Sequence, residues 1–186
     1  PELEFDNIVI SGKTLNELNK IMPEQNCIVD VVVSDNQVLF RFANILFYTR
    51  ILDGVYPDTS KIIPKEYKTE MTIRTKPLLE AIDRAYLLSR EEKTNIVRMV
   101  TQENQIVEVS SSSTELGKVK EQLDADRLVG EPVKIAFNSK YMLDALKVTD
   151  SETILMGFTG PMSPIIIKPA DHIRMLHMIL PYRTTD

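Results

Sequence analysis

The sequence predicts an α+β protein, in which helices lie on one side of antiparallel β-sheets. Stretches that alternate apolar and polar side chains recur along the chain, and three amphipathic helical stretches stand among them. Each helical stretch follows one strand-like stretch and precedes three others, so the order β-α-β-β-β is repeated three times. Antiparallel sheets with segregated helices are the architecture that this order favours.

The first repeat covers residues 6–52. Residues 6–11 alternate as a strand, and residues 13–22 form an amphipathic helix that Pro23 ends. Three strands are then expected, at residues 28–34, 37–43 and 45–52. A connector over residues 53–58 leads to the second repeat.

The second and third repeats follow the same order. The second begins with a strand over residues 70–75 and a helix over residues 77–89, because Pro77 is allowed in a first turn. Its further strands are expected at residues 96–101, 105–110 and 115–125. The third has a helix over residues 139–148, and its strands are expected at residues 133–137, 153–158, 164–168 and 175–180.

The composition is that of a globular protein in a reducing compartment. Hydrophobic residues make up 43% of 186 positions and charged residues 26%, which excludes a disordered or low-complexity chain. The apolar runs are too short to span a bilayer, and no stretch resembles a signal peptide. The single cysteine, Cys27, cannot form an internal disulfide, so we expect a cytoplasmic protein. The net charge of −5 means that any binding to DNA must use one segregated cationic face.

Residue patterns of a catalytic or metal centre are missing from the sequence. The two histidines, His172 and His177, have no metal-ligand spacing with each other or with Cys27. The segment Gly12-Lys13-Thr14 ends like a phosphate-binding loop, but Asn7 stands where that loop needs glycine. We therefore expect no catalytic residue, no metal and no cofactor.

The first repeat lacks a partner. Two complete repeats over residues 63–186 would form one domain with a pseudo-twofold axis. A lone repeat leaves one side of its sheet and helix uncovered, so we expect the chain to be part of a longer protein.

Four motifs carry a resemblance to a known family. They are RILDGVYPDT at residues 50–59, IDRAYLLS at 82–89, FNSKYMLDALK at 137–147 and ILPYRT at 179–184. In this order they resemble the bacterial sliding clamp, the beta subunit of DNA polymerase III, most closely in its low-GC Gram-positive form. The resemblance implies a DNA-clamp fold, with sheets outside and helices lining the inner face. It assigns residues 1–62 to the second half of the middle domain and residues 63–186 to the third domain.

The resemblance also implies a function without catalysis. A sliding clamp is a processivity factor for DNA replication, which closes as a head-to-tail homodimer around duplex DNA and tethers the replicative polymerase. It recruits the polymerase, the clamp loader and repair proteins through linear motifs, in the cytoplasm at replication forks.

The helices that would line the hole carry cations. The candidates for contacts to DNA phosphates are Lys13, Lys20, Arg84, Lys140 and Lys147. Such contacts carry no sequence information, as sliding requires. Any one of these side chains could instead be an ordinary solubilising residue, which is the weaker of the two interpretations.

One helix carries an apolar residue on its polar face. Leu87 falls between Arg84 and Glu91, which indicates either incidental exposure or a contact surface. The resemblance places Leu87 and Leu88 at the subunit interface.

The resemblance implies a hydrophobic cleft between the middle and third domains for partner peptides. The matching positions are Pro57, Asp58, Lys61, Ile62, Asn138, Tyr141, Met162, Pro164, Met178, Ile179, Leu180, Pro181, Tyr182 and Arg183. Met, Ile and Leu provide an adaptable groove, while Asn, Tyr and Arg orient a peptide. Either Ile179 or Leu180 could instead belong to the core, since a strand points alternate side chains inward.

Two other functions are weighed against the clamp. An enzyme on an α+β scaffold is disfavoured by the missing catalytic constellation. A clamp-like interaction scaffold without a DNA role would differ from a clamp in one respect, because only a clamp ring is retained on circular but not on linear DNA.

Overall fold

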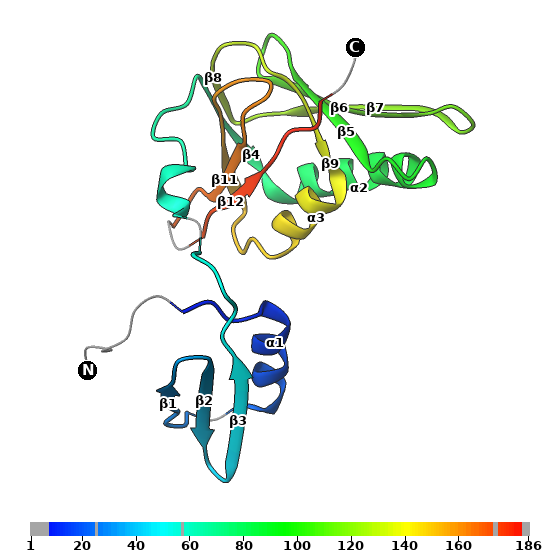
Figure 1. Ribbon diagram of the computed structural model, residues 1–186. Helices are drawn as coiled ribbons and strands as arrows, with labels where there is room; N and C mark the ends of the chain where they lie inside the picture. Colours follow the sequence, from blue (N-terminus) through cyan, green and yellow to red (C-terminus); the bar gives the residue numbers. More distant parts are fainter. Residues whose placement is uncertain (1–7, 25, 57, 173–174, 184–186) are drawn as a thin grey trace. The chain divides into compact units, whose positions relative to one another are not determined.

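A computed structural model describes residues 8–24, 26–56, 58–172 and 175–183 (Figure 1). The chain divides into a first unit, residues 1–60, and a second unit, residues 61–186. A short 3-10 helix, η1 (Thr59–Lys61), follows the strands of the first unit along the chain.

The first unit is a three-stranded antiparallel sheet with one helix, α1 (Gly12–Ile21). Its strands, in spatial order, are β1 (Asp30–Val33), β2 (Gln37–Phe42) and β3 (Ile45–Arg50). Leu18 of α1 and Val38 and Phe42 of β2 are buried and form its small core. The helix and three strands are those that the sequence predicts, with ends that differ by at most two residues.

The expected strand over residues 6–11 is wrong for the part that the structure describes. Residues 8–11 belong to no strand, and residues 6 and 7 lie outside the described residues. The Val9 carbonyl accepts one backbone hydrogen bond, from the Leu52 N–H at 2.8 Å. A strand requires a ladder of such bonds, and alternating side chains do not by themselves provide its partner.

The second unit consists of two antiparallel sheets and two helices, α2 (Thr75–Glu91) and α3 (Ser139–Lys147). The first sheet, in spatial order, contains β12 (His177–Ile179), β11 (Ile165–Pro169), β10 (Thr153–Phe158), β4 (Thr69–Arg74) and β8 (Arg127–Gly130). The second sheet contains β7 (Gly117–Asp124), β6 (Ile106–Ser113), β5 (Ile96–Thr101) and β9 (Lys134–Asn138).

Two expectations for this unit need correction. Strand β8 is missing from the sequence prediction, because only four residues pair with β4 and a single one of them, Leu128, is even half-buried. Helix α2 begins two residues before Pro77 and ends two residues after Ser89. Pro77 is therefore the third helical residue and still lies in the first turn, where its missing N–H costs no helical hydrogen bond.

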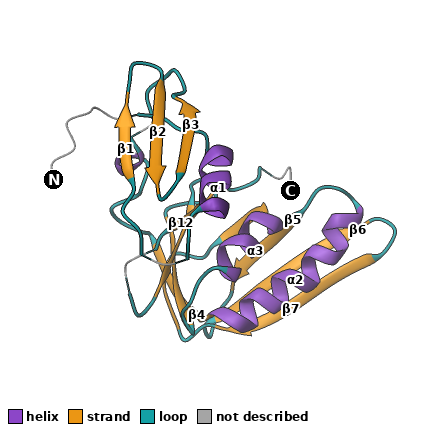
Figure 2. Cartoon of the chain, turned by 90° about the horizontal axis from the view of Figure 1, so that it is seen from below, coloured by secondary structure: helices purple, strands orange, loops and turns teal. Residues whose placement is uncertain are grey.

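The two repeats of the second unit exchange their first strands. Strand β4 precedes α2 but pairs with β10 of the other repeat, while β9 precedes α3 but pairs with β5. The exchange joins both repeats in one core, in which Met71 lies opposite Met156 and Val97 lies opposite Phe137, all fully buried. The helices α2 and α3 lie side by side on this core (Figure 2).

Hydrogen bonds at the helix starts follow the same pseudo-symmetry. The Thr75 hydroxyl at the start of α2 donates to the Ser151 carbonyl, beyond the end of α3, at 2.7 Å. The Ser139 hydroxyl at the start of α3 donates to the Asn95 carbonyl, beyond the end of α2, at 2.9 Å. Both hydroxyl-bearing residues are buried, so these bonds satisfy groups that would be costly to leave unpaired. They fix the two helices in one layer.

Candidate DNA-facing and partner-binding surfaces

Exposed lysines occur at equivalent positions on α1 and α3. Lys13 and Lys20 on α1, and Lys140 and Lys147 on α3, are all exposed. Their helices place each pair two turns apart, on one face. A spacing of this kind presents two cations in a row along each helix.

A carboxylate that sequence reasoning missed stands between the lysines of each pair. Glu17 follows Lys13 by four residues and accepts a 2.8 Å ion pair from Lys20. Asp144 follows Lys140 by four residues and is exposed. The (i, i+4) spacing puts each carboxylate on the lysine face, so each face has a net charge of +1 rather than +2. The same spacing, read from the sequence, could have revealed both residues.

The guanidinium of Arg84 is directed at the sheet. Its Nε and Nη2 atoms each lie 2.6 Å from a carboxylate oxygen of Glu121 on β7. The hydrogen bond from Arg84 holds the pKa of Glu121 below its ordinary value, and Glu121 raises the pKa of Arg84. Part of the Arg84 charge is thus neutralised within the unit, and its contact with DNA stays a prediction.

Glu121→Gln should lower the stability of the chain at neutral pH and leave it unchanged in acid. A carboxylate with a depressed pKa in the folded state stabilises that state above its unfolded pKa, near 4.3 for glutamate. That contribution is lost as the pH falls through the folded pKa of Glu121. Urea unfolding of the two proteins from neutral pH down to pH ~3 checks this. A difference in stability that persists below both pKa values would contradict it.

Leu87 and Leu88 occupy different environments on α2. Leu87 is 49% exposed, while Leu88 is half-buried. Leu87 therefore presents an apolar side chain to solvent one turn after Arg84. This is compatible with a contact surface, and the subunit interface stays a prediction.

The structure shows which of Ile179 and Leu180, at the C-terminal strand, belongs to the core. Ile179 is 7% exposed and belongs to the core, whereas Leu180 is 67% exposed. Pro181 forms a β-bridge with Phe137, and the Tyr182 N–H donates to the Ala136 carbonyl at 2.6 Å. The segment beyond β12 is thus attached to β9 by its backbone, with the Leu180 side chain outside the core.

Some of the predicted cleft residues meet within the second unit. Met162 and Tyr182 line one hollow of about 240 Å³, and each is about half exposed. Tyr141 and Ile62 are exposed, and so is Arg183.

The other predicted cleft positions have varied surroundings. Asn138 caps the N-terminus of α3, because its side chain accepts a hydrogen bond from the Lys140 N–H at 3.0 Å. This structural role was not predicted from the sequence. Met178, Pro164 and Pro181 are partly buried. Asp58 and Lys61 are exposed, and Pro57 lies outside the described residues.

Neither a metal-binding cluster nor a membrane-spanning helix is present among the described residues. In the described part of the chain, no group of three or more His, Cys, Asp or Glu side chains could hold a metal ion. None of the helices described is long and apolar enough to cross a membrane.

Comparisons with protein families match nearly the whole chain. Residues 2–58 match the model of the DNA polymerase III beta subunit, central domain, and residues 60–183 match that of its C-terminal domain. The beta sliding clamp of Halalkalibacterium halodurans is 48% identical over 183 residues, which are 98% of this chain and 48% of the relative. The beta sliding clamp of Bacillus subtilis is 46% identical over 184 residues, 99% of this chain and 49% of the relative.

Solved structures agree with these matches. A crystal structure of the Bacillus subtilis DNA polymerase sliding clamp superposes with a TM-score of 0.87 at 46% identity, over 96% of this chain and 47% of that one. The DNA polymerase III beta chain of Streptococcus pneumoniae gives a TM-score of 0.88 at 34% identity, over 98% of this chain and 49% of that one. The chain thus spans about half the length of its relatives and has the DNA-clamp fold.

Proposed function

The chain belongs to the DNA polymerase III beta subunit family, the beta sliding clamps, and we propose that it supplies DNA-facing and partner-binding surfaces of a replication processivity factor. The sliding clamp is a non-catalytic subunit of DNA polymerase III. The chain spans about half of such a subunit, so closure around DNA requires the full-length protein as a homodimer.

In this proposal, residues 1–62 are the second half of the clamp middle domain and residues 63–186 are the third domain. The two compact units and the two family matches support this division, and they change over near residue 60. The protein would act in the cytoplasm, at replication forks.

The proposed mechanism is topological. A closed ring cannot leave DNA sideways, and a polymerase tethered to it rebinds at a high effective concentration. Lys13, Lys20, Lys140 and Lys147 would contact phosphates, and Arg84 would add a weaker contact because Glu121 already binds it. The observation that carries the proposal is the matched pair of exposed lysines on α1 and α3, since a ring must offer phosphate contacts from several domains without reading sequence.

Partner proteins would bind the second unit through short linear motifs with a buried leucine or phenylalanine. Leu180, Tyr182 and Met162 support this role, because all three expose largely apolar side chains, and the segment that contains Leu180 and Tyr182 is attached to β9 by its backbone. Tyr141 and Arg183 would order the polar end of the motif. The polymerase, the clamp loader and repair proteins are the partners we propose.

Replacing Lys140 and Lys147 with Glu in a full-length ring should shorten its residence on circular DNA. Two phosphate contacts would become repulsive, and the dependence on salt should weaken, with the slope of log K against log salt falling by about two. Retention on nicked circular DNA over a salt series measures this. The matched control replaces Lys65 and Lys93, which are exposed and outside the helices, with Glu.

Equal retention of the parent, the helix variant and the control would contradict the DNA-facing role of α3. Failure of the parent ring itself to stay on circular DNA would favour the clamp-like scaffold without a DNA role.

A further inference from the structure

The four-stranded sheet of the second unit has a cationic outer face. Its inner residues, such as Met99 and Val109, are buried in the core, so the alternate residues point away from it. Arg98 on β5 lies opposite Ser110 on β6, which lies opposite Lys120 on β7. Lys118 on β7 and Lys134 on β9 add further charge to the same face. We call Arg98, Lys118, Lys120 and Lys134 the basic annex.

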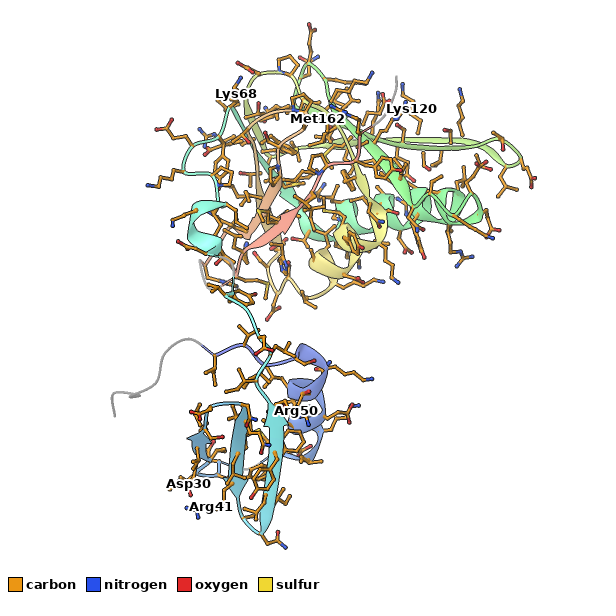
Figure 3. The ribbon with its side chains drawn as sticks, in the orientation of Figure 1. Asp30, Arg41, Arg50, Lys68, Lys120 and Met162 are labelled. Atoms are coloured by element: carbon orange, nitrogen blue, oxygen red, sulfur yellow. The ribbon has the colours of Figure 1, made fainter. Side chains whose placement is uncertain are left out.

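The basic annex is continuous with the proposed motif-binding residues. Arg98 lines two hollows. One, of about 480 Å³, is also lined by Ser110, Lys118 and Lys120. The other, of about 240 Å³, is also lined by Lys134, Met162 and Tyr182. A surface therefore runs from Met162 across Arg98 to Lys120, and both end residues are labelled in Figure 3.

The carboxylates beside the basic annex already have hydrogen-bond partners. Glu108 accepts a 2.7 Å ion pair from Lys120 and a 2.6 Å hydrogen bond from the Gln102 amide. Glu92, at the far end of the larger hollow, accepts the Thr114 N–H at 2.5 Å and its hydroxyl at 2.7 Å. The exposed Asp124 lies on the same face of β7, and Arg98 already has an interaction partner, so the positive charge that this surface offers to a ligand comes mainly from Lys118 and Lys134, in a protein whose net charge is −5.

We infer that the basic annex binds an acidic stretch of the partner chain, directly beside the apolar part of the motif. The inference rests on the proposed function, because binding of the apolar part of the motif would position the acidic stretch that flanks it. Three strand spacings separate β9 from β7, about 14 Å, which an extended flank of about four or five residues covers. Carboxylates on such a flank would meet the ammonium groups of Lys118 and Lys134, while the Ser110 hydroxyl offers a hydrogen bond.

The charge complementarity favours an acidic peptide over an apolar one at this surface. Exposed lysines are costly to desolvate against an apolar partner, whereas they attract carboxylates and speed the encounter. We therefore expect the acidic flank to add affinity that salt removes.

The test uses the 186-residue chain and fluorescent peptides that share one leucine- and phenylalanine-containing anchor. Each peptide carries a flank of about five residues, either alternating Asp and Ser or Ser alone, at its amino or its carboxyl end. Anisotropy titrations at low salt should give about tenfold tighter binding for one acidic peptide than for its serine counterpart. High salt should remove the difference.

The variant Lys118→Gln should lower the gain and leave binding of the serine peptide unchanged. Lys118 is exposed, lies outside the hollow that contains Met162 and Tyr182, and does not hold Glu108, so the substitution leaves that buried carboxylate paired. Lys76→Gln is the matched control, since Lys76 is an exposed lysine that lines a different hollow, and it should retain the gain.

Three outcomes would overturn the inference. Equal affinity of acidic and serine peptides in both orientations would do so while leaving the motif-binding proposal intact, and so would a gain that is undiminished in Lys118→Gln. Binding of a single-stranded oligonucleotide that depends on Lys118, without a gain for acidic peptides, would reassign the surface to nucleic acid. If no peptide bound at all, the proposed motif-binding function would itself fail.

Discussion

Leu180→Ala is expected to weaken binding of a leucine- or phenylalanine-containing motif about thirtyfold, since truncating a buried interface anchor costs about 2 kcal/mol. Leu180 is 67% exposed in the unbound chain, so its truncation should leave the stability of the fold nearly unchanged. The expected loss therefore arises at the interface. Titration of a fluorescent motif peptide against the parent and the variant measures it.

The matched control for this experiment is Leu87→Ala. Leu87 is also an exposed leucine, but it lies on α2 and not in the C-terminal segment. The Leu87→Ala variant should bind the peptide with the affinity of the parent. Equal affinity of all three proteins would mean that the peptide binds elsewhere, and a loss in both variants would point to a general effect of leucine truncation.

Regular periodicity made most elements of this fold predictable. The strands over residues 96–101 and 153–158 have the bounds that the alternation predicts, because each has an inner face fully buried in the core. The strand at residues 127–130 was missed, and that at residues 6–11 was wrong in its described part. Residues 127–130 form a strand because they pair with β4, whereas residues 8–11 have no such pairing among the described residues. In both cases the presence of a pairing partner decides the structure, and the local sequence does not encode that partner.

The sequence predicted which types of residue form the candidate sites, but it did not predict which residues lie next to them. The motifs pointed to exposed lysines on the helices and to an apolar C-terminal segment, and both features are present. The pairing of Arg84 with Glu121 joins residues 37 positions apart, and Arg98 lines two hollows formed by different strands. Contacts of this kind depend on strand register, which periodicity leaves open. The same register decides that Ile179 is buried and Leu180 is not.

Phe137→Ala is expected to destabilise the second unit by about 3–5 kcal/mol, since it removes a large core side chain and leaves a cavity. Phe137 is fully buried on β9, opposite Val97. A loss of this size is a large fraction of the 5–15 kcal/mol that stabilises a typical domain. Urea unfolding should show a lower midpoint, with the protein still folded in water.

The same substitution should also weaken motif binding, because β9 holds the C-terminal segment. Phe137 bridges Pro181, and its neighbour Ala136 accepts the Tyr182 N–H. Met156→Ala is the matched control, since Met156 is fully buried in the same core but lies on β10, which does not pair with that segment. Both variants should lose stability, and only Phe137→Ala should lose affinity for the motif peptide at temperatures where both are folded. Equal affinity of the two variants would contradict the coupling of β9 to the motif-binding segment, whereas an unchanged unfolding midpoint for Phe137→Ala would contradict its place in the core.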